Sequence, residues 1–163
     1  MNLFKEDMQN YNTGIKRARH VLFHYTLRKR QLCAAGGGVR KFWGALFRMS
    51  LSGTGCEIYT SKIGNRCFFP HLSGIIIAYF AEIGNDCVIC QQVTIGIDRF
   101  RDKHKAPFIG NNCFIGAGAK IIGPIRIGDN VRIGANTVVT KDVPSNCTVV
   151  GANRIIQRGE AEK

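Results

Sequence analysis

The sequence predicts a mainly β fold in which short strands stack as coils of a parallel β-helix, with a small α-helical appendage before them. Three observations support this prediction. An aliphatic residue recurs every six positions over long stretches, glycine follows many of these residues, and both features begin only after residue 55. An α-helix would need a spacing near 3.6 residues and an alternating strand a spacing near 2, so neither explains this period.

Residues 1–55 are expected to form a basic α-helical segment. Residues 15–32 and 39–51 place apolar residues at helical spacing, with Lys and Arg between them. The segment holds 10 Lys or Arg against 2 acidic residues, which gives +8 of the net charge of +12. No nucleic-acid-binding motif accompanies this charge, so we do not expect a nucleic-acid partner, while contact of the basic N-terminus with a membrane surface stays open.

Residues 56–150 are expected to form the β-helix domain and residues 151–163 a C-terminal tail. The aliphatic residue of each repeat should point inward, and the glycine after it should permit a corner conformation that other residues resist. The repeated positions are Ile63, Phe69, Ile75, Ile83, Ile89, Ile95, Ile109, Ile115, Ile121, Ile127, Ile133 and Val139.

A second inward position follows four residues after each aliphatic one and takes small or β-branched residues. Three of the seven cysteines occupy it, so we expect them to fill the core as small hydrophobes. A metal site at the Cys-x-x-Cys pair formed by Cys87 and Cys90 is not expected, because no second pair or nearby histidine follows. The residues at this position are Cys67, Cys87, Val93, Cys113, Ala119, Val131, Thr137 and Val143.

Two interruptions break the period. Two extra residues fall between Ile75 and Ile83, and two more between Ile95 and Ile109, the second time within the polar stretch 98–105. A polar insertion must leave the β-helix as a loop, and such loops often bear functional residues.

Several strings extend the pattern beyond a bare repeat, and on them the chain from Ile63 to Ile156 resembles the serine acetyltransferases among the hexapeptide-repeat acyltransferases. The resemblance implies a left-handed parallel β-helix, a homotrimer, and active sites in grooves between subunits. The strings are His71-Leu-Ser-Gly, Gln91-Gln-Val-Thr, Asp102-Lys-His104, Ile115-Gly-Ala-Gly-Ala-Lys and Ile133-Gly-Ala-Asn-Thr.

The resemblance also implies an acetyl-CoA-dependent O-acetyltransferase with no required metal. His71 matches the histidine that removes the proton from the acceptor hydroxyl. Imidazole suits this step, because its ordinary pKa near 6.5 lets it accept a proton at neutral pH. His104 matches a second histidine that helps to bind the acceptor or polarise the site, and Glu57 is expected to orient His71.

The same alignment predicts where acetyl-CoA binds. Family members lay the pantetheine arm along the outer groove of the last coils, against backbone groups at the corners. Here the matching residues are Gly116, Ala117, Gly118 and Ala135, and Arg132 matches a basic position expected to approach the CoA phosphates.

The acceptor is predicted from two departures. In serine acetyltransferases an acidic residue precedes the catalytic histidine and an arginine precedes the second one, whereas this chain has Pro70 and Lys103. These departures favour a sugar hydroxyl as acceptor. Serine O-acetylation proper, N-acetylation of an amino sugar and a non-catalytic β-helix module stay open as alternatives. The start of the chain has no apolar signal segment, so a cytoplasmic location is expected.

Overall fold

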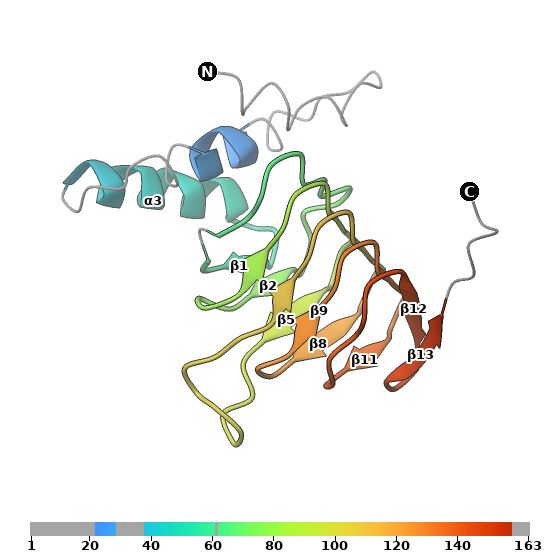
Figure 1. The fold of residues 1–163 in the computed structure, drawn as a ribbon. Coiled ribbons are helices and arrows are strands. Elements are labelled where there is room, and N and C mark those ends of the chain that lie inside the picture. Colours follow the sequence, from blue (N-terminus) through green and yellow to red (C-terminus); the bar gives the residue numbers. More distant parts are fainter. Residues whose placement is uncertain (1–21, 29–37, 61, 158–163) are drawn as a thin grey trace.

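The computed structural model describes residues 22–28, 38–60 and 62–157 (Figure 1). Residues 22–28 are helical, α3 (Gly38–Leu51) follows, and the rest of the described chain consists of short strands joined by turns. The strands are β1 (Glu57–Ile58), β2 (Ile76–Ile77), β3 (Glu82–Ile83), β4 (Val88–Ile89), β5 (Thr94–Gly96), β6 (Phe108–Ile109), β7 (Phe114–Ile115), β8 (Lys120–Ile122), β9 (Arg126–Ile127), β10 (Arg132–Ile133), β11 (Val138–Val139), β12 (Cys147–Val150) and β13 (Arg154–Gln157).

The strands form three sheets, and from β2 to β11 each pair joins strands three positions apart along the chain, as β2 with β5 and β3 with β6. Sheet A contains β1, β2, β5, β8 and β11; sheet B contains β3, β6 and β9; sheet C contains β4, β7, β10, β12 and β13. Every pair is parallel except β12 with β13. The chain therefore turns from sheet A to B to C and back to A, which confirms the predicted parallel β-helix.

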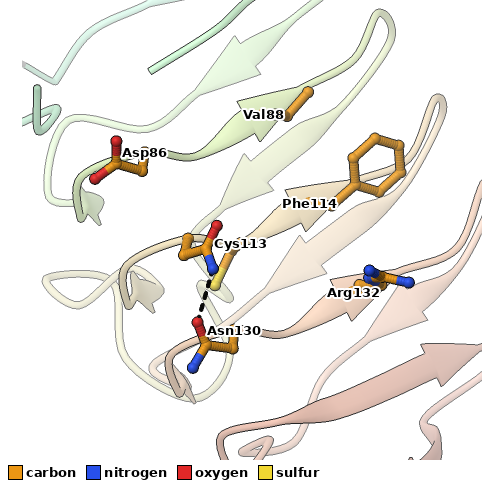
Figure 2. A pocket seen from close by; sticks show the side chains of 7 residues that line it. Asp86, Val88, Cys113, Phe114, Asn130 and Arg132 are labelled. Atoms are coloured by element: carbon orange, nitrogen blue, oxygen red, sulfur yellow. Dashed lines mark hydrogen bonds between the residues drawn. The ribbon is translucent and has the colours of Figure 1, made fainter. Parts of the chain in front are cut away.

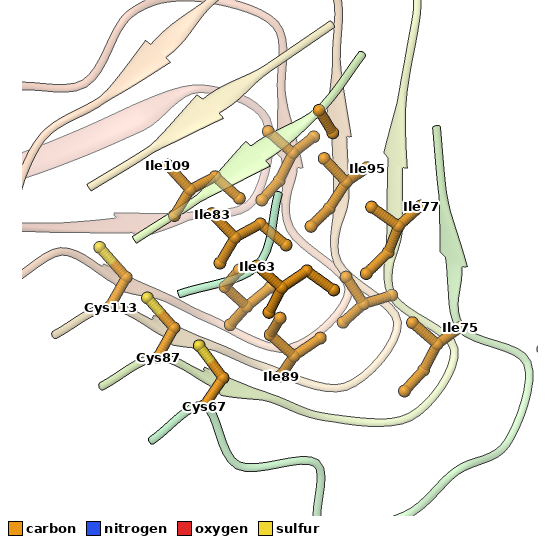
Figure 3. Close-up of a cluster of buried hydrophobic side chains, with 14 of the residues drawn as sticks. Ile63, Cys67, Ile75, Ile77, Ile83, Cys87, Ile89, Ile95, Ile109 and Cys113 are labelled. Carbon is orange, nitrogen blue, oxygen red and sulfur yellow. The ribbon is translucent and has the colours of Figure 1, made fainter. Parts of the chain in front are cut away.

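The inward-pointing side chains of successive coils stack in columns. Ile83 lies beside Ile109, and Ile77 beside Ile95, and all four are almost completely buried (Figure 3). Burying one such isoleucine contributes about 1.5–3 kcal/mol relative to leaving it exposed. Because inward side chains from all three sheets join one buried cluster and stack on those of neighbouring coils, the core is continuous along the stack.

The three cysteines predicted to fill the core do so. Cys67, Cys87 and Cys113 are buried and stacked in one column (Figure 3). Each thiol lies 3.2 Å from the carbonyl oxygen of a glycine in the next coil, as Cys87 does with Gly110. The hydrogen bond with Cys113 lowers the pKa of Cys87, but the bond with Cys67 and burial outweigh it and raise this pKa to about 12. The thiol of Cys87 is thus a packing group that stays protonated.

The glycines of the repeat are required for a different reason from the one predicted. Gly84 and Gly116 do not have positive φ angles. Instead, a Cβ atom on Gly84 would lie 2.6 Å from the carbonyl oxygen of Gly110, and one on Gly116 would lie 2.6 Å from the backbone nitrogen of Ala135. These glycines allow neighbouring coils to approach closely. The left-handed conformation falls instead on polar corner residues such as Asn112.

The first interruption of the repeat lies at the corner that contains His71, rather than on the following side of the coil where the isoleucine spacing placed it. Phe68 pairs with Val88, and Ile76 pairs with Thr94. Phe68 and Ile76 are therefore eight positions apart, whereas the matching residues of the next coil, Val88 and Thr94, are six positions apart. The two extra residues widen the corner at His71.

The second interruption is larger than predicted. Ile95 in β5 and Ile109 in β6 lie on consecutive sides of one coil, as Ile121 and Ile127 do in the next coil. They are 14 residues apart instead of six, so eight residues rather than two leave the stack. The resulting loop projects from the body between β5 and β6 (Figure 1).

The two ends of the stack differ. At the β1 end the helical residues pack on the first coil, where Phe23, Phe47 and Phe69 form a buried aromatic cluster. Arg28 donates hydrogen bonds to the carbonyl oxygens of Ile63 and Gly64 at 3.0 and 2.7 Å. At the other end β13 adds an antiparallel strand to sheet C, within the segment that the sequence analysis set apart as a tail.

Candidate active site

One edge of the stack, where the chain passes from sheet C to sheet A, brings together several of the predicted site residues. We call it the C–A edge. His71 lies on it in the first coil, Gln91 in the next, and Ala117 and Ala135 in the two coils after that. Backbone hydrogen bonds connect these corners, including one of 2.9 Å from Gly118 to the carbonyl oxygen of Gln91. The predicted base, His71, and the corners at Ala117 and Ala135 that are predicted to bind CoA (the CoA corner) therefore lie along the same edge.

The CoA corner has backbone donors to offer. Gly116 is buried, and its N–H donates to the carbonyl oxygen of Ile133 in the next coil, so this N–H is not available to a ligand. Among the described residues, the N–H groups of Ala117 and Ala135 donate to no protein acceptor. Gly118 has φ +73°, and its carbon faces the side chain of Asn136 in the following coil. This edge can thus bind an extended chain containing amide groups.

His71 is held by its backbone and leaves its ring exposed. Its carbonyl oxygen accepts a hydrogen bond of 3.1 Å from Ser73, and Gly74 donates to Thr54 in the preceding turn at 2.9 Å. In the described part of the chain no side chain bonds to the imidazole, whose ring is therefore available to a substrate. The widened corner provides this exposure.

Glu57 lies on the outer face of sheet A in β1, paired in register with Ile76. It is exposed and accepts a hydrogen bond of 3.0 Å from the hydroxyl of Tyr59. That bond, with the negative charge of Glu57, raises the pKa of Tyr59. Among the described residues no bond joins Glu57 to His71, so its orienting role stays a prediction.

His104 lies on a different edge, where the chain passes from sheet A to sheet B. Its ring lies 6.3 Å from that of Phe80, edge to face, on the corner that follows β2. Arg101 of the same loop donates to the carbonyl oxygen of Thr140 at 3.1 Å, two coils further on. The loop therefore lies along this A–B edge. Phe80 was not predicted from the sequence, because its contact depends on the size of the loop.

Asp102 shapes the turn that presents His104. Its carboxylate accepts the backbone N–H of His104 at 2.9 Å and forms an ion pair of 3.3 Å with Lys105. The backbone bond from His104 is the largest cause that lowers the pKa of Asp102, and Lys105 adds to it. The charged form of Asp102 is thus the one that holds this turn.

The two histidines do not meet within one chain. His71 stands on the C–A edge and His104 on the A–B edge, and the full width of sheet A lies between these edges. A site that uses both histidines needs the C–A edge of one copy of the chain beside the A–B edge of another.

Arg132 lies on the outer face of sheet C, next to a hollow of about 430 Å³ (Figure 2). Its neighbours in register are Phe114 and Thr148. His71, His104 and Glu57 do not line this hollow. Arg132 is three residues before Ala135, so its guanidinium is on the sheet adjoining the C–A edge rather than on the edge itself. The lining residues are Asp86, Val88, Asn112, Cys113, Phe114, Asn130 and Arg132.

No group of three or more His, Cys, Asp or Glu side chains that could hold a metal ion occurs among residues 22–28, 38–60 and 62–157.

Comparison with known proteins gives a consistent result. The family of the bacterial transferase hexapeptide (six repeats) matches residues 106–141. A serine acetyltransferase of Synechococcus elongatus is 46% identical over 107 residues, which cover 64% of this chain and 44% of that protein. A serine acetyltransferase of Helicobacter pylori is 44% identical over 110 residues, which cover 66% of this chain and 64% of that protein.

Solved structures agree. A serine acetyltransferase in complex with cysteine has a TM-score of 0.82 at 26% identity, covering 99% of this chain and 67% of that one. The serine acetyltransferase of Brucella abortus in complex with coenzyme A has a TM-score of 0.75 at 27% identity, covering 96% and 67%.

The fold and these matches agree on the class of architecture: the chain is a parallel β-helix whose repeats are similar to those of the bacterial transferase hexapeptide family. Within that class it resembles the serine acetyltransferases, as the sequence predicted. The chain spans 44% and 64% of the lengths of the Synechococcus and Helicobacter relatives. The preference for a sugar acceptor gains no support from these relatives, which are serine acetyltransferases.

Proposed function

We propose that this chain is an acetyl-CoA-dependent O-acetyltransferase whose acceptor is serine. The observation that carries the proposal is the C–A edge, where His71, Gln91, Ala117 and Ala135 lie in successive coils. A thioester bound along the last coils would thereby point its acetyl end toward the histidine. The similarity to serine acetyltransferases supports both the reaction and the acceptor.

The reaction runs by direct transfer. His71 removes the proton from the serine hydroxyl, and the oxygen attacks the carbonyl carbon of the thioester. The carbon–sulfur bond then breaks, and the imidazolium returns the proton to the leaving sulfur, so the products are O-acetylserine and CoA thiol. N–H donors near the thioester oxygen would stabilise its developing negative charge.

The pantetheine arm is expected to bind the free N–H groups of Ala117 and Ala135. Gly116 and Gly118 keep the corner low enough for an extended chain to approach, because neither has a side chain. Arg132 is proposed to bind the CoA phosphates from sheet C, where its exposed guanidinium adjoins the same edge.

The active site is proposed to form between subunits of a homotrimer of left-handed β-helices. The positions of the two histidines support this assembly, since His71 and His104 lie on opposite edges of sheet A. In a ring of copies related by threefold rotation, one edge of each subunit meets the other edge of its neighbour. His104 would then bind the acceptor beside a neighbour's His71, with Glu57 orienting that base.

Serine remains compatible with the two departures from the family pattern. Lys103 retains a positive charge next to His104 that can pair with the carboxylate of serine. Pro70 removes the acidic partner for the ammonium group, so we expect weaker serine binding than a carboxylate at this position would give. Pro70→Asp should therefore lower the KM for serine.

The first experiment follows CoA thiol release from acetyl-CoA with L-serine, sugars, amino sugars and nucleotide sugars as acceptors. Serine-dependent release, lost in His71→Ala, supports the proposal. CoA thiol release with a sugar and none with serine would show that the acceptor is a sugar and would leave the proposed mechanism unchanged. Acetyl-CoA binding without transfer to any acceptor would contradict the proposed activity.

The intersubunit site is tested by mixing two inactive variants. Chains with His71→Ala and chains with His104→Ala are denatured together in equal amounts and refolded. If each site takes one histidine from each of two neighbours, random mixing restores both histidines in about one site in four. Recovery of about a quarter of the unmodified activity supports the composite site. If the oligomers are shown to be mixed and no activity returns, both histidines must act within one chain.

A further inference from the structure

Helix α3 presents a second apolar face that stays largely exposed, although Phe42 on it contacts the ring of Trp43 edge to face at 5.4 Å. Phe47 and Leu51 on its buried side join the core. Val39, Phe42 and Met49 are instead 63%, 58% and 68% exposed. At about 100° per residue these three side chains fall within about 80° of one another along the helix. They form an apolar stripe on the outside of the molecule.

Basic residues accompany this stripe and acidic ones do not. Helix α3 contains no Asp or Glu, and Lys41 and Arg48 on it are exposed. Between Met8 and Cys56 the sequence has nine Lys or Arg and no acid. A surface that combines exposed large apolar side chains with only positive charge fits a partner that is both apolar and anionic.

The position of α3 leaves the stripe accessible. The helix lies across the β1 end of the stack, away from the later coils (Figure 1). No helix among the described residues is long and apolar enough to cross a membrane. Helix α3, with 14 residues, would therefore contact lipid along the surface of the bilayer rather than across it.

We propose that α3 binds the surface of an anionic lipid bilayer, with Val39, Phe42 and Met49 inserted among the acyl chains near the headgroups. Lys41 and Arg48 extend their long side chains to the phosphates. A nucleic acid would use the cations but would leave the apolar stripe in water. A second copy of α3 would cover the stripe but would bring two acid-free, positively charged helices together, which repel each other.

This proposal is independent of acetyl transfer. It assigns to the helical end of the molecule a role in location, and the acetyl-transfer residues lie on other elements. Its failure would leave the proposed enzyme unaffected, and an inactive chain could still bind lipid.

The test is flotation of the full chain with vesicles made of equal parts phosphatidylcholine and phosphatidylglycerol, compared with vesicles of phosphatidylcholine alone. We expect binding to the anionic vesicles only, weakened by added salt. The triple variant Val39→Ser, Phe42→Ser, Met49→Ser should bind these vesicles with an affinity lowered more than about tenfold, because three apolar groups no longer insert. Lys41→Gln with Arg48→Gln should weaken it about thirtyfold.

Two matched variants serve as controls. Phe100 is fully exposed on the loop between β5 and β6, so Phe100→Ser tests whether any exposed aromatic side chain suffices. Lys141 is exposed near the opposite end of the stack, so Lys141→Gln removes a charge far from α3. Both should bind vesicles like the unmodified chain. Circular dichroism verifies that each variant is folded.

Four results would overturn the proposal. The triple variant could bind anionic vesicles as tightly as the unmodified chain. The unmodified chain could bind both kinds of vesicle equally or neither. Light scattering without lipid could reveal that the triple variant forms a smaller assembly, which would assign the stripe to contacts between copies. Binding of a single-stranded oligonucleotide with no vesicle binding would assign the basic charge to nucleic acid.

Discussion

The corner at His71 and the loop at His104 interrupt the same repeat in different ways. The corner adds two residues and stays against the stack, and its backbone bonds to the turn before it. The loop adds eight residues, projects from the stack, and is held by Arg101 and by the contact between Phe80 and His104. One interruption exposes a side chain at a fixed position, and the other extends a side chain beyond the edge.

This difference separates two requirements of the proposed site. A general base must stand within hydrogen-bond reach of its proton, which a short, bonded corner can ensure. A group that reaches a neighbouring subunit needs length, which a loop supplies. The regular repeat provides neither, because its strand side chains alternate between the core and the outer face of a sheet.

The largest effect is expected at the corner. His71→Ala should lower kcat by a factor of about 10² to 10⁴, because the acceptor hydroxyl loses its base. The free energy of unfolding should change by less than about 0.5 kcal/mol, since the ring is exposed. Steady-state kinetics and denaturant titration measure the two effects.

A repeat position gives the opposite pattern and serves as the control for His71. Ile115 is fully buried, so Ile115→Ala should cost about 2–5 kcal/mol of stability. The fraction that remains folded should retain its kcat. Full activity in His71→Ala would remove the distinction between corner and repeat.

The next effect is expected from removing the loop. Deletion of residues 99–106 leaves Ile95 and Ile109 six residues apart, as the repeat requires. We expect the stack to fold with a stability changed by no more than about 1 kcal/mol, because shortening a loop changes its closure entropy little. Acceptor-dependent turnover should be lost while acetyl-CoA still binds, as isothermal calorimetry would measure. A deletion variant that fails to fold would mean that the loop belongs to the stack.

A smaller effect is expected from His104 alone. His104→Ala should raise the KM for the acceptor about 10- to 100-fold with a lesser effect on kcat, since it removes one or two charge-assisted hydrogen bonds. Initial rates at varied acceptor concentration separate the two constants. An equal fall in kcat at saturating acceptor would instead give His104 a role in the transition state.

The smallest effect concerns Asp102. Because its pKa is lowered in the folded chain, its charged form stabilises the turn above the ordinary pKa of Asp, and this contribution is lost as pH falls through the lowered value. At neutral pH Asp102→Ala should raise the acceptor KM about two- to fivefold by releasing the turn at His104. A pH series of KM checks this: the unmodified chain should approach the variant only in acid.

The sequence predicted the parts of the molecule that follow one local rule. Ile109 to Val139 could be assigned because each coil repeats the same steric demands, and Cys67 could be assigned to the core because its position is one of those demands. The location of the two extra residues at His71 could not be predicted. Ile75 and Ile77 are both buried, and either one can serve as the inward residue of the six-residue repeat.

Contacts between distant segments could also not be predicted from the sequence. The edge-to-face contact between Phe80 and His104 depends on which edge the loop follows. The sequence placed both histidines in one site by resemblance, but it contains no signal for the width of sheet A between them. The reason for the glycines was misjudged for the same cause, since the close approach of Gly84 to Gly110 is a contact between coils.

The caps at the two ends have a consequence for the number of coils. A coil in the middle of the stack gives no information about how many coils should follow, since each offers the next the same row of unpaired backbone groups. Arg28 occupies two carbonyl oxygens at the start, and the reversed strand β13 ends sheet C in a pattern that a further coil cannot copy. The count is therefore fixed by the non-repeating residues, and the isoleucine ladder only fills the length between them.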